Sequence, residues 1–262
     1  MYKVLYPGFV SILILLFSIA GVAHGQTVTL DYYFNHESHH TANGDQRYHY
    51  LWEDYANTGF SIWGDSFKQQ GLTLSSLENA PTAENLKGTS IYIIVDPDNS
   101  KESPHPNYIL ENDANTIAQW VKAGGVLVIM ANDSANIELP HLNTLAGKFG
   151  LHFNDDLQNH VIDDAHFNDG TATITDTGIF KTTKKVFLKD VCSIQLTGPA
   201  KAVLKSANGA VIACKTRYGK GTVFAVGDPW LYNEYVNGRL TPGFENDKAG
   251  NELAQWLKKQ IP

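Results

Sequence analysis

Four apolar runs constrain the fold of this chain more than any other feature of its sequence. They are 27-TVTLDYYF-34, 72-LTLSSL-77, 90-SIYIIVD-96 and 126-VLVIMAN-132. Three of the four are nearly uninterrupted, and uninterrupted apolar runs of this length are typical of strands that helices cover on both faces. The runs therefore predict parallel strands at the centre of an α/β domain.

Amphipathic segments separate or follow these runs, as a layered α/β fold requires. The predicted helices span 61–70, 111–125, 140–150 and 247–260. The second begins with acidic residues and stops at Gly124-Gly125, and the third begins at Pro140 and stops at Gly150. This alternation of strands and helices predicts a three-layer, doubly wound, mostly parallel sheet in which the four strands are parallel and central.

The pattern changes after residue 150. Short alternating stretches with Asp, Asn and Gly turns continue to residue 200 and predict a small β excursion from the sheet. The segments 210–218 and 222–228 then flank Gly219-Lys220-Gly221, which predicts a hairpin. No linker or internal repeat separates these parts, so residues 26–262 are expected to form a single domain.

The first 25 residues are typical of a secretory signal peptide. Lys3 precedes the apolar run 8-GFVSILILLFSIAGVA-23, and small residues in 23-AHG-25 suit signal peptidase. The mature chain is therefore expected to begin near Gln26 and to be periplasmic or secreted, with no membrane attachment after cleavage. The alternative is an uncleaved anchor, for which the run is short.

Charge and cysteine content limit the partners. Removing Lys3 with the signal leaves 19 basic residues against 27 acidic ones. This acidic balance argues against nucleic acid or an anionic membrane surface as partner, but not against a small anionic substrate. Cys192 and Cys214 are the only cysteines. They could form a disulfide or remain as two buried thiols, because their spacing in the sequence alone cannot show whether they meet.

Polar segments follow four of the predicted strands. They are 34–54, 96–106, 131–136 and 227–235, and the first contains four histidines. The carboxyl ends of parallel strands meet at one edge of a sheet, where ligands bind in open α/β folds. We therefore expect a ligand site at this edge, with a merely solvated edge as the alternative.

The order of strands and helices resembles the glutamine amidotransferase-like superfamily, with its flavodoxin-like layers. Amidotransferases of that superfamily carry a nucleophilic Cys after the strand that corresponds to 126–132, where this chain has Asn132-Asp133. Because no thiolate is available at this position, amidotransferase chemistry is not expected.

Four longer blocks carry a narrower resemblance. They are 46–65, 92–98, 124–133 and 217–235. They resemble a secreted, nucleophile-less class I domain of polysaccharide-degrading bacteria, which is associated with unsaturated glucuronyl hydrolases. Within this group, dehydratases of ulvan oligosaccharides are the nearest parallel. The resemblance implies a lyase that removes water from a non-reducing-end glucuronate or iduronate and delivers a C4–C5 unsaturated sugar to such hydrolases.

That reaction needs a base for the proton on C5, a counter-charge for the carboxylate and an acid for the leaving C4 hydroxyl. Histidine suits both proton transfers and arginine suits the carboxylate. The candidate catalytic residues are His36, Glu37, Arg47, Tyr48 and His49. The candidate substrate-binding residues are Asp96, Asn132, Asp133, Trp230, Tyr232, Asn233, Glu234 and Arg239.

Each candidate has a structural alternative. Arg47 could pair with Glu53 or Asp54, and His49 could be a core histidine. The acids around Pro97 could form a turn and Asp133 could cap a helix. Further residues interpreted as structural or solvated rather than functional are His39, His40, Trp52 and Trp63.

Two other functions and one cofactor stay open. A glycoside hydrolase would need two carboxylates, for which Glu37 and Glu234 are available. A non-catalytic carbohydrate-binding module would use Trp230 and Tyr232. No cofactor is predicted, since the chain has no HExxH motif or cysteine pair typical of zinc. A divalent cation that holds the substrate carboxylate is the alternative to arginine.

Overall fold

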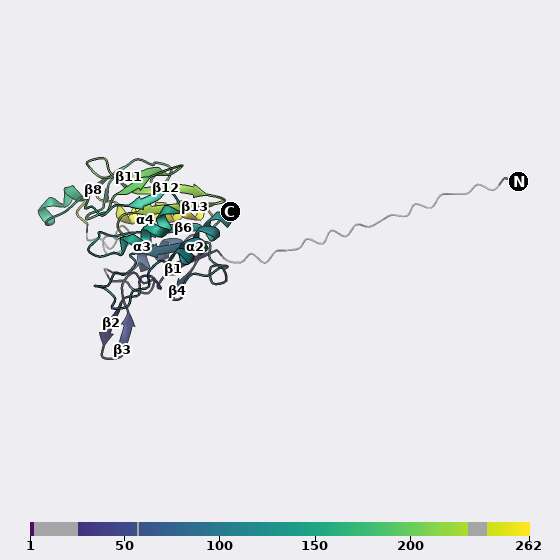
Figure 1. Cartoon of the computed structure of the whole chain (residues 1–262). Helices are drawn as coiled ribbons and strands as arrows, with labels where there is room; N and C mark the ends of the chain where they lie inside the picture. The colour runs from purple at the N-terminus through teal and green to yellow at the C-terminus, as the bar shows by residue number, and fades with distance from the viewer. Residues whose placement is uncertain (3–25, 57, 230–239) are drawn as a thin grey trace.

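The protein is a mixed α/β domain built on one large sheet, seen in a computed structural model that describes residues 1–2, 26–56, 58–229 and 240–262 (Figure 1). The sheet runs in the order β4-β1-β5-β6-β13-β12-β11-β8-β9. In that order the bounds are Thr73–Leu77, Thr27–Asp31, Ile91–Val95, Val126–Met130, Gly221–Val226, Val211–Tyr218, Lys201–Lys205, Thr171–Ile174 and Val186–Phe187. The pairings from β4 to β13 are parallel, and those from β13 to β9 are antiparallel.

Helices cover both faces of the sheet. They are α1 (Ser61–Lys68), α2 (Glu111–Ala123), α3 (Leu139–Gly147) and α4 (Asn246–Lys258). Alternate residues of β5 and β6 belong to two separate hydrophobic clusters, one shared with α1 and α4 and the other with α2 and α3. Every residue of β5 and β6 is buried, because both faces of these strands are covered. None of the described helices is long and apolar enough to cross a membrane.

Smaller elements decorate this framework. The strands β2 (Ser38–Thr41) and β3 (Gly44–Arg47) form a hairpin that projects from the body of the molecule (Figure 1). The strands β7 (Leu151–Phe153) and β10 (Ile194–Leu196) pair with each other, and a 3-10 helix spans Asp164–Gly170.

The four predicted strands and four predicted helices are present, with ends that differ by a few residues. The prediction that all four strands are central was wrong for β4, which lies at the edge of the sheet. Its middle residues Ser75 and Ser76 are only partly buried, and polar residues are tolerated there because one side of the strand has no neighbour. The first strand ends at Asp31 rather than at residue 34, because the Asp31 carboxylate accepts hydrogen bonds from the N–H groups of Tyr33 and Phe34 and turns the chain.

The region from 150 to 200 was predicted as an excursion, which is correct for β7 and β10 only. The strands β8 and β9 instead extend the main sheet beyond β11. The predicted hairpin around Gly219 is confirmed by the antiparallel register of β12 and β13, with Tyr218 opposite Gly221. Gly219 has a φ of 58°, which an L-residue adopts at a cost, and Gly suits this turn for that reason.

Helix α1 offers a direct test of the core. Phe67 is fully buried against the sheet, whereas Ile62 on the same helix is 37% exposed. Phe67→Ala should lower the free energy of unfolding by roughly 3–5 kcal/mol, since it leaves a cavity. Ile62→Ala, the matched control, should change it by less than about 1 kcal/mol. Urea unfolding of residues 26–262 measures both values, and equal effects would contradict the packing described here.

Candidate functional site

The carboxylate of Asp96 lies at the centre of the strand ends. Asp96 follows β5 directly and is buried, with 2% of its surface exposed. One of its oxygens, Oδ2, accepts hydrogen bonds from the Tyr50 hydroxyl at 2.9 Å and from the Asn132 amide at 2.8 Å. The Asp96 carboxylate thereby joins the ends of β5 and β6 to the segment that follows the β2–β3 hairpin.

The end of β1 attaches to the same place through its own polar residues. The Asn35 side-chain amide donates to the backbone carbonyl of Asp96 at 3.0 Å, and the His36 N–H donates to Asp98 Oδ2 at 3.0 Å. Asn35 and Asp98 are both buried, with 1% of their surfaces exposed. The Oδ1 atoms of Asn35, Asp96 and Asp98 are buried and accept no hydrogen bond within the described residues.

The hairpin carries His49 back against Glu37. The Tyr48 N–H donates to the Glu37 carbonyl at 3.1 Å, and His49 Nδ1 lies 2.7 Å from Glu37 Oε1. The imidazole is stacked between two tyrosine rings, with centroid distances of 5.0 Å to Tyr48 and 4.1 Å to Tyr50. A carboxylate that holds one imidazole nitrogen fixes the ring orientation and leaves the other nitrogen to accept a proton.

Three residues of this network have backbone angles that bulky side chains rarely adopt. The φ values are 68° for His49, 49° for Tyr50 and 43° for Asp96. Such conformations cost free energy and persist where surrounding contacts enforce them. Here the enforcing contacts are the Glu37–His49 and Tyr50–Asp96 hydrogen bonds themselves.

Arg47, the last residue of β3, lies beside this network. Its Nη1 donates to Glu78 Oε1 at 2.7 Å and lies 3.9 Å from Glu53, while its guanidinium covers the Tyr32 ring at 4.1 Å from the ring centre. The structural alternative for Arg47 is therefore present, with Glu78 as the nearer acid. Its Nε and Nη2 atoms are buried and have no partner among the described residues. These two nitrogens form the edge of the guanidinium that binds a carboxylate through two parallel hydrogen bonds.

Burial holds protons on the acids of this edge. It raises the pKa of Asp98 to about 7 and that of Glu102 to about 7, and it raises the pKa of Asp96 well above its usual range. The negative charge of Glu37 adds to all three shifts. Burial and the neighbouring Asp96 charge also raise the pKa of the Tyr50 hydroxyl well above its ordinary value. The edge can thus supply protons near neutral pH.

Most of the candidate site residues that the structure describes lie in one region, but they do not all contact one another. Glu37, His49, Asp96 and Asn132 belong to the network above, and the Asp133 N–H donates to the Asn132 side-chain oxygen at 2.8 Å. The His36 ring is held locally instead, with Nδ1 3.1 Å from the backbone carbonyl of Tyr32. The predicted residues that lie outside the described part of the chain are Trp230, Tyr232, Asn233, Glu234 and Arg239.

Several residues that had a structural interpretation in the sequence analysis can be assigned from their contacts. Trp52 and Trp63 are core residues, as interpreted from the sequence. His40 pairs with Asp45 in solvent, where its side chain is 83% exposed. Asp133 does not cap helix α3, since Glu138 accepts from the His141 N–H there; Asp133 instead accepts from the Ala135 N–H within a turn.

Sequence reasoning missed Tyr50, Asp98 and Glu102 as parts of the site. Tyr50 was one aromatic among several in a polar segment, and no spacing rule marks a tyrosine that will reach a carboxylate 46 residues away. Asp98 and Glu102 did follow a predicted strand, which was the available signal. The interpretation of Asp98 as a turn residue overlooked that the first turn after a buried strand can itself be buried.

The described residues offer neither a metal site nor an activated thiol. Within the described ranges, no group of three or more His, Cys, Asp or Glu side chains is arranged to hold a metal ion. Cys192 and Cys214 are free and buried, and burial raises the pKa of both thiols. Neither has the environment of a reactive cysteine, since an activated thiol has a lowered pKa.

Comparisons with known proteins show the fold alone. The chain matches no protein-family model and no curated protein. The N-terminal domain of mmIFT52 is 16% identical with a TM-score of 0.66, over 89% of this chain and 97% of that one. The cytoplasmic protein STM1381 from Salmonella typhimurium LT2 is 12% identical with a TM-score of 0.57, over 90% and 100%. A beta-galactosidase from Bacillus circulans sp. alkalophilus is 10% identical with a TM-score of 0.54, over 90% of this chain but 31% of that one.

The raised pKa of Asp98 predicts a pH-dependent contribution to stability. In the unfolded chain an aspartate titrates near pH ~4, so the folded state holds its proton more tightly between pH ~4 and about 7. The contribution is present below this range and is lost as the pH rises through it. The free energy of unfolding of the wild type should therefore fall between pH ~5 and ~8, whereas that of Asp98→Asn should not. The difference between the two proteins should shift in favour of the variant by at least about 1 kcal/mol over this range.

The measurement is urea unfolding at both pH values, with Asp155→Asn as the matched control because Asp155 is exposed. The control should follow the wild type at both pH values. Parallel stability curves for Asp98→Asn and the wild type would show that the carboxyl is not held protonated in the folded state.

Proposed function

We propose that this protein is a carbohydrate-active lyase that removes water from the uronic acid at the non-reducing end of an acidic oligosaccharide. The contact between Glu37 and His49 at 2.7 Å, beside the unpaired edge of Arg47, is the observation that carries the proposal. The proposal includes a flavodoxin-like, glutamine amidotransferase-like layering of the domain. It also includes export after cleavage near Gln26 and a supply of product to unsaturated glucuronyl hydrolases.

His49 is the proposed base. Glu37 holds Nδ1, so Nε2 accepts the proton on C5 of the uronate, which is acidic because it lies beside the carboxylate. Glu37 also stabilises the imidazolium that forms. In this role it resembles the acid that orients a catalytic histidine rather than a nucleophile or a hydrolytic acid.

Arg47 is the proposed binding group for the substrate carboxylate. Charge builds up on that carboxylate as the C5–H bond breaks, and a guanidinium that binds it through Nε and Nη2 stabilises this charge. Glu78 keeps the third nitrogen, Nη1, and so orients the free edge. A divalent cation at the carboxylate is the alternative, in which Arg47 would be only structural.

His36 is the proposed acid, since it lies in the polar segment beyond β1 and its backbone N–H donates to Asp98 at the same edge. As the C4–O bond breaks, the C4 hydroxyl takes a proton and leaves as water, and the C5–H electrons form the C4–C5 double bond. No oxidant or reductant is needed.

The acidic edge must tolerate an anionic substrate. Five carboxyl groups lie near the proposed position, namely Glu37, Asp96, Asp98, Glu102 and Asp133. Their combined charge would repel a uronate if all were ionised. The raised pKa values of Asp96, Asp98 and Glu102 remove part of this charge near neutral pH, so a uronate can approach Arg47 without meeting the full repulsion.

His49→Ala should lower turnover of uronate-terminated oligosaccharides by on the order of a hundred- to ten-thousand-fold, and His36→Ala should also lose most turnover. Binding should change little in either variant. His40→Ala is the matched control, because His40 lies on the same hairpin in solvent. The measurement is the ultraviolet absorbance of the conjugated product together with a count of reducing ends. Near wild-type rates for both histidine variants would overturn the assignment.

Arg47→Lys should lower turnover and weaken binding of uronate substrates, because a point charge cannot replace the planar edge. Binding of the same oligosaccharide with a reduced, uncharged terminal sugar should be weak in both proteins. Equal kinetics for Arg47→Lys and the wild type would instead favour a cation, which chelation would then reveal. New reducing ends without absorbance, lost in Glu37→Gln and Glu234→Gln, would favour a glycoside hydrolase.

A further inference from the structure

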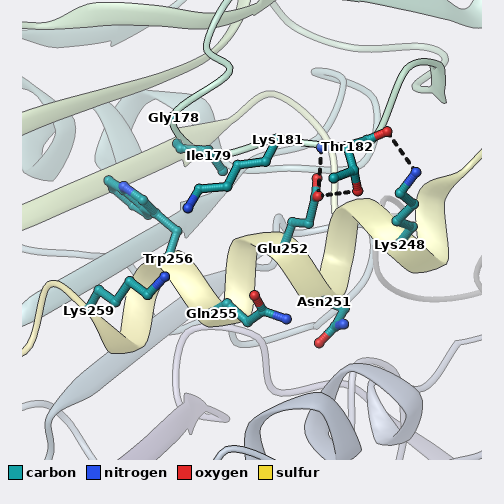
Figure 2. A pocket seen from close by; sticks show the side chains of 10 residues that line it. All are labelled: Gly178, Ile179, Lys181, Thr182, Lys248, Asn251, Glu252, Gln255, Trp256 and Lys259. Atoms are coloured by element: carbon teal, nitrogen blue, oxygen red, sulfur yellow. Dashed lines mark hydrogen bonds between the residues drawn. The ribbon is translucent and has the colours of Figure 1, made fainter.

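Trp256 on helix α4 lies between two hollows that the proposed reaction does not use. One hollow has a volume of about 340 Å³ and is lined by Lys181, Thr182, Gln255 and residues nearby (Figure 2). The other has a volume of about 400 Å³ and is lined by residues from β11, β12 and β13 with Gln260. Trp256 lines both. The hollows therefore form one continuous surface with an aromatic ring at its middle.

The second of these hollows lies at the end of the sheet opposite the candidate site. Thr222 lines the second hollow and is the second residue of β13. The candidate site instead follows the last residues of β1, β5 and β6, which run parallel to one another, and β13 is parallel to β6. A ligand in this hollow is thus held away from His49 and Arg47.

The surface is basic in a chain whose formal net charge is −7. Six cationic side chains line the two hollows: Lys181, Lys201, Lys215, Arg217, Lys248 and Lys259. The lining residues include one carboxylate, Glu252. Lys215 pairs with Asp176 and Lys248 with Glu245 at 3.0 Å. No ion pair or side-chain hydrogen bond engages Lys181, Lys201 or Lys259 within the described part of the chain.

Glu252 contributes one negative charge against the six cationic side chains, and its oxygens are already engaged. Its Oε1 accepts from the backbone N–H and hydroxyl of Thr182 at 2.8 and 2.7 Å, as Figure 2 shows. Its Oε2 accepts from the hydroxyl of Thr183 at 2.8 Å. Both carboxylate oxygens are therefore satisfied by neutral donors of the protein, and Lys181 is left to meet an anion from outside.

Neutral polar groups on the same surface suit the hydroxyl groups of a sugar. Asn251 and Gln255 line the first hollow and Gln260 lines the second. Thr216 also lines the second hollow; it is 4% exposed, and its hydroxyl has no hydrogen-bond partner among the residues that the structure describes. A buried hydroxyl without a partner costs free energy, and a polar group of a ligand in the hollow would remove this cost.

We infer that the Trp256 surface binds a segment of an acidic polysaccharide, with its carboxylate or sulfate groups on the lysines and a sugar face on the Trp256 ring. The identification of the ligand as an acidic sugar rests on the proposed function. The basic charge of the surface and its aromatic ring are observed independently of that function. Lys215 already lies 5.4 Å from the centre of the Trp256 ring, so a charged sugar would meet a cation and an aromatic ring together.

The composition favours a sugar over single-stranded nucleic acid. Proteins that bind single strands stack successive bases on several aromatic rings, whereas Trp256 is the one aromatic residue among the residues that line these two hollows. The three carboxamides and the Thr216 hydroxyl match hydroxyl groups, which a sugar chain presents at every unit.

The test measures binding of the mature protein to sulfated, uronate-containing ulvan by titration calorimetry. Lys181→Gln with Lys259→Gln should weaken binding on the order of tenfold, and Trp256→Ala should weaken it by a similar factor. Lys87→Gln with Lys122→Gln is the matched control, since it removes two exposed lysines elsewhere and should bind like the wild type. A neutral dextran should not bind any of these proteins.

Unchanged ulvan affinity in Lys181→Gln with Lys259→Gln would overturn the inference, and so would equal loss in the control. Binding of a single-stranded oligonucleotide as tight as that of ulvan would overturn it too, since it would show a general polyanion surface. Turnover of a short uronate oligosaccharide should be the same in the double variant and the wild type, while His49→Ala should still bind ulvan. If neither the wild type nor any variant forms product, but the differences in ulvan affinity are as expected, the proposed reaction is wrong and the inferred binding surface is supported.

Discussion

The hydrogen bonds to the buried Asp96 carboxylate hold together the parts of the molecule on which the candidate site depends. Asp96 Oδ2 accepts from Tyr50 and from Asn132, and the Asp96 backbone carbonyl accepts from Asn35. These partners come from segments that are far apart in the sequence, and each lies beyond a strand or hairpin end. Without this carboxylate the ends of β1, β5 and β6 would still be near one another, but the Tyr50 side chain would lose its hydrogen bond to them.

The same arrangement explains the unusual backbone and the raised pKa values. A buried carboxylate is stable only when donors satisfy it or a proton neutralises it, and here both occur. The left-handed conformations of His49 and Tyr50 place one ring against Glu37 and the other hydroxyl on Asp96. Strain in the backbone is thus offset by hydrogen bonds that a relaxed chain could not make, and it orients His49.

Much of the fold was predictable because buried strands have apolar sequences that are easily recognised. β5 and β6 are covered on both faces, and their apolar runs reflect this. The position of β4 at the edge was missed, although Ser75 and Ser76 in its middle are polar. The β2–β3 hairpin could not be predicted from periodicity, since no residue of either strand is buried and neither face has an apolar stripe.

The location of the candidate site could be predicted from the sequence, but the pairs of residues that contact each other within it could not. The rule that ligands bind at the carboxyl ends of parallel strands gave Asp96 and Asn132 the right neighbourhood. It could not give the pairing of His49 with Glu37, because that depends on a hairpin whose register returns the chain to its starting point. It also could not show that Arg47 would bind Glu78 through one nitrogen and keep two without partners.

Charge is distributed unevenly over the molecule, and this matters for an acidic ligand. The strand-end edge concentrates Glu37, Asp96, Asp98, Glu102 and Asp133, whereas the Trp256 surface is lined mainly by cations. A long acidic chain would be attracted to the basic surface and repelled from the acidic edge. In the proposed reaction a single terminal uronate can still enter that edge, because the buried acids there can hold protons. This polarity would separate retention of a polymer from reaction at a chain end, and it follows from where the fold buries its carboxylates.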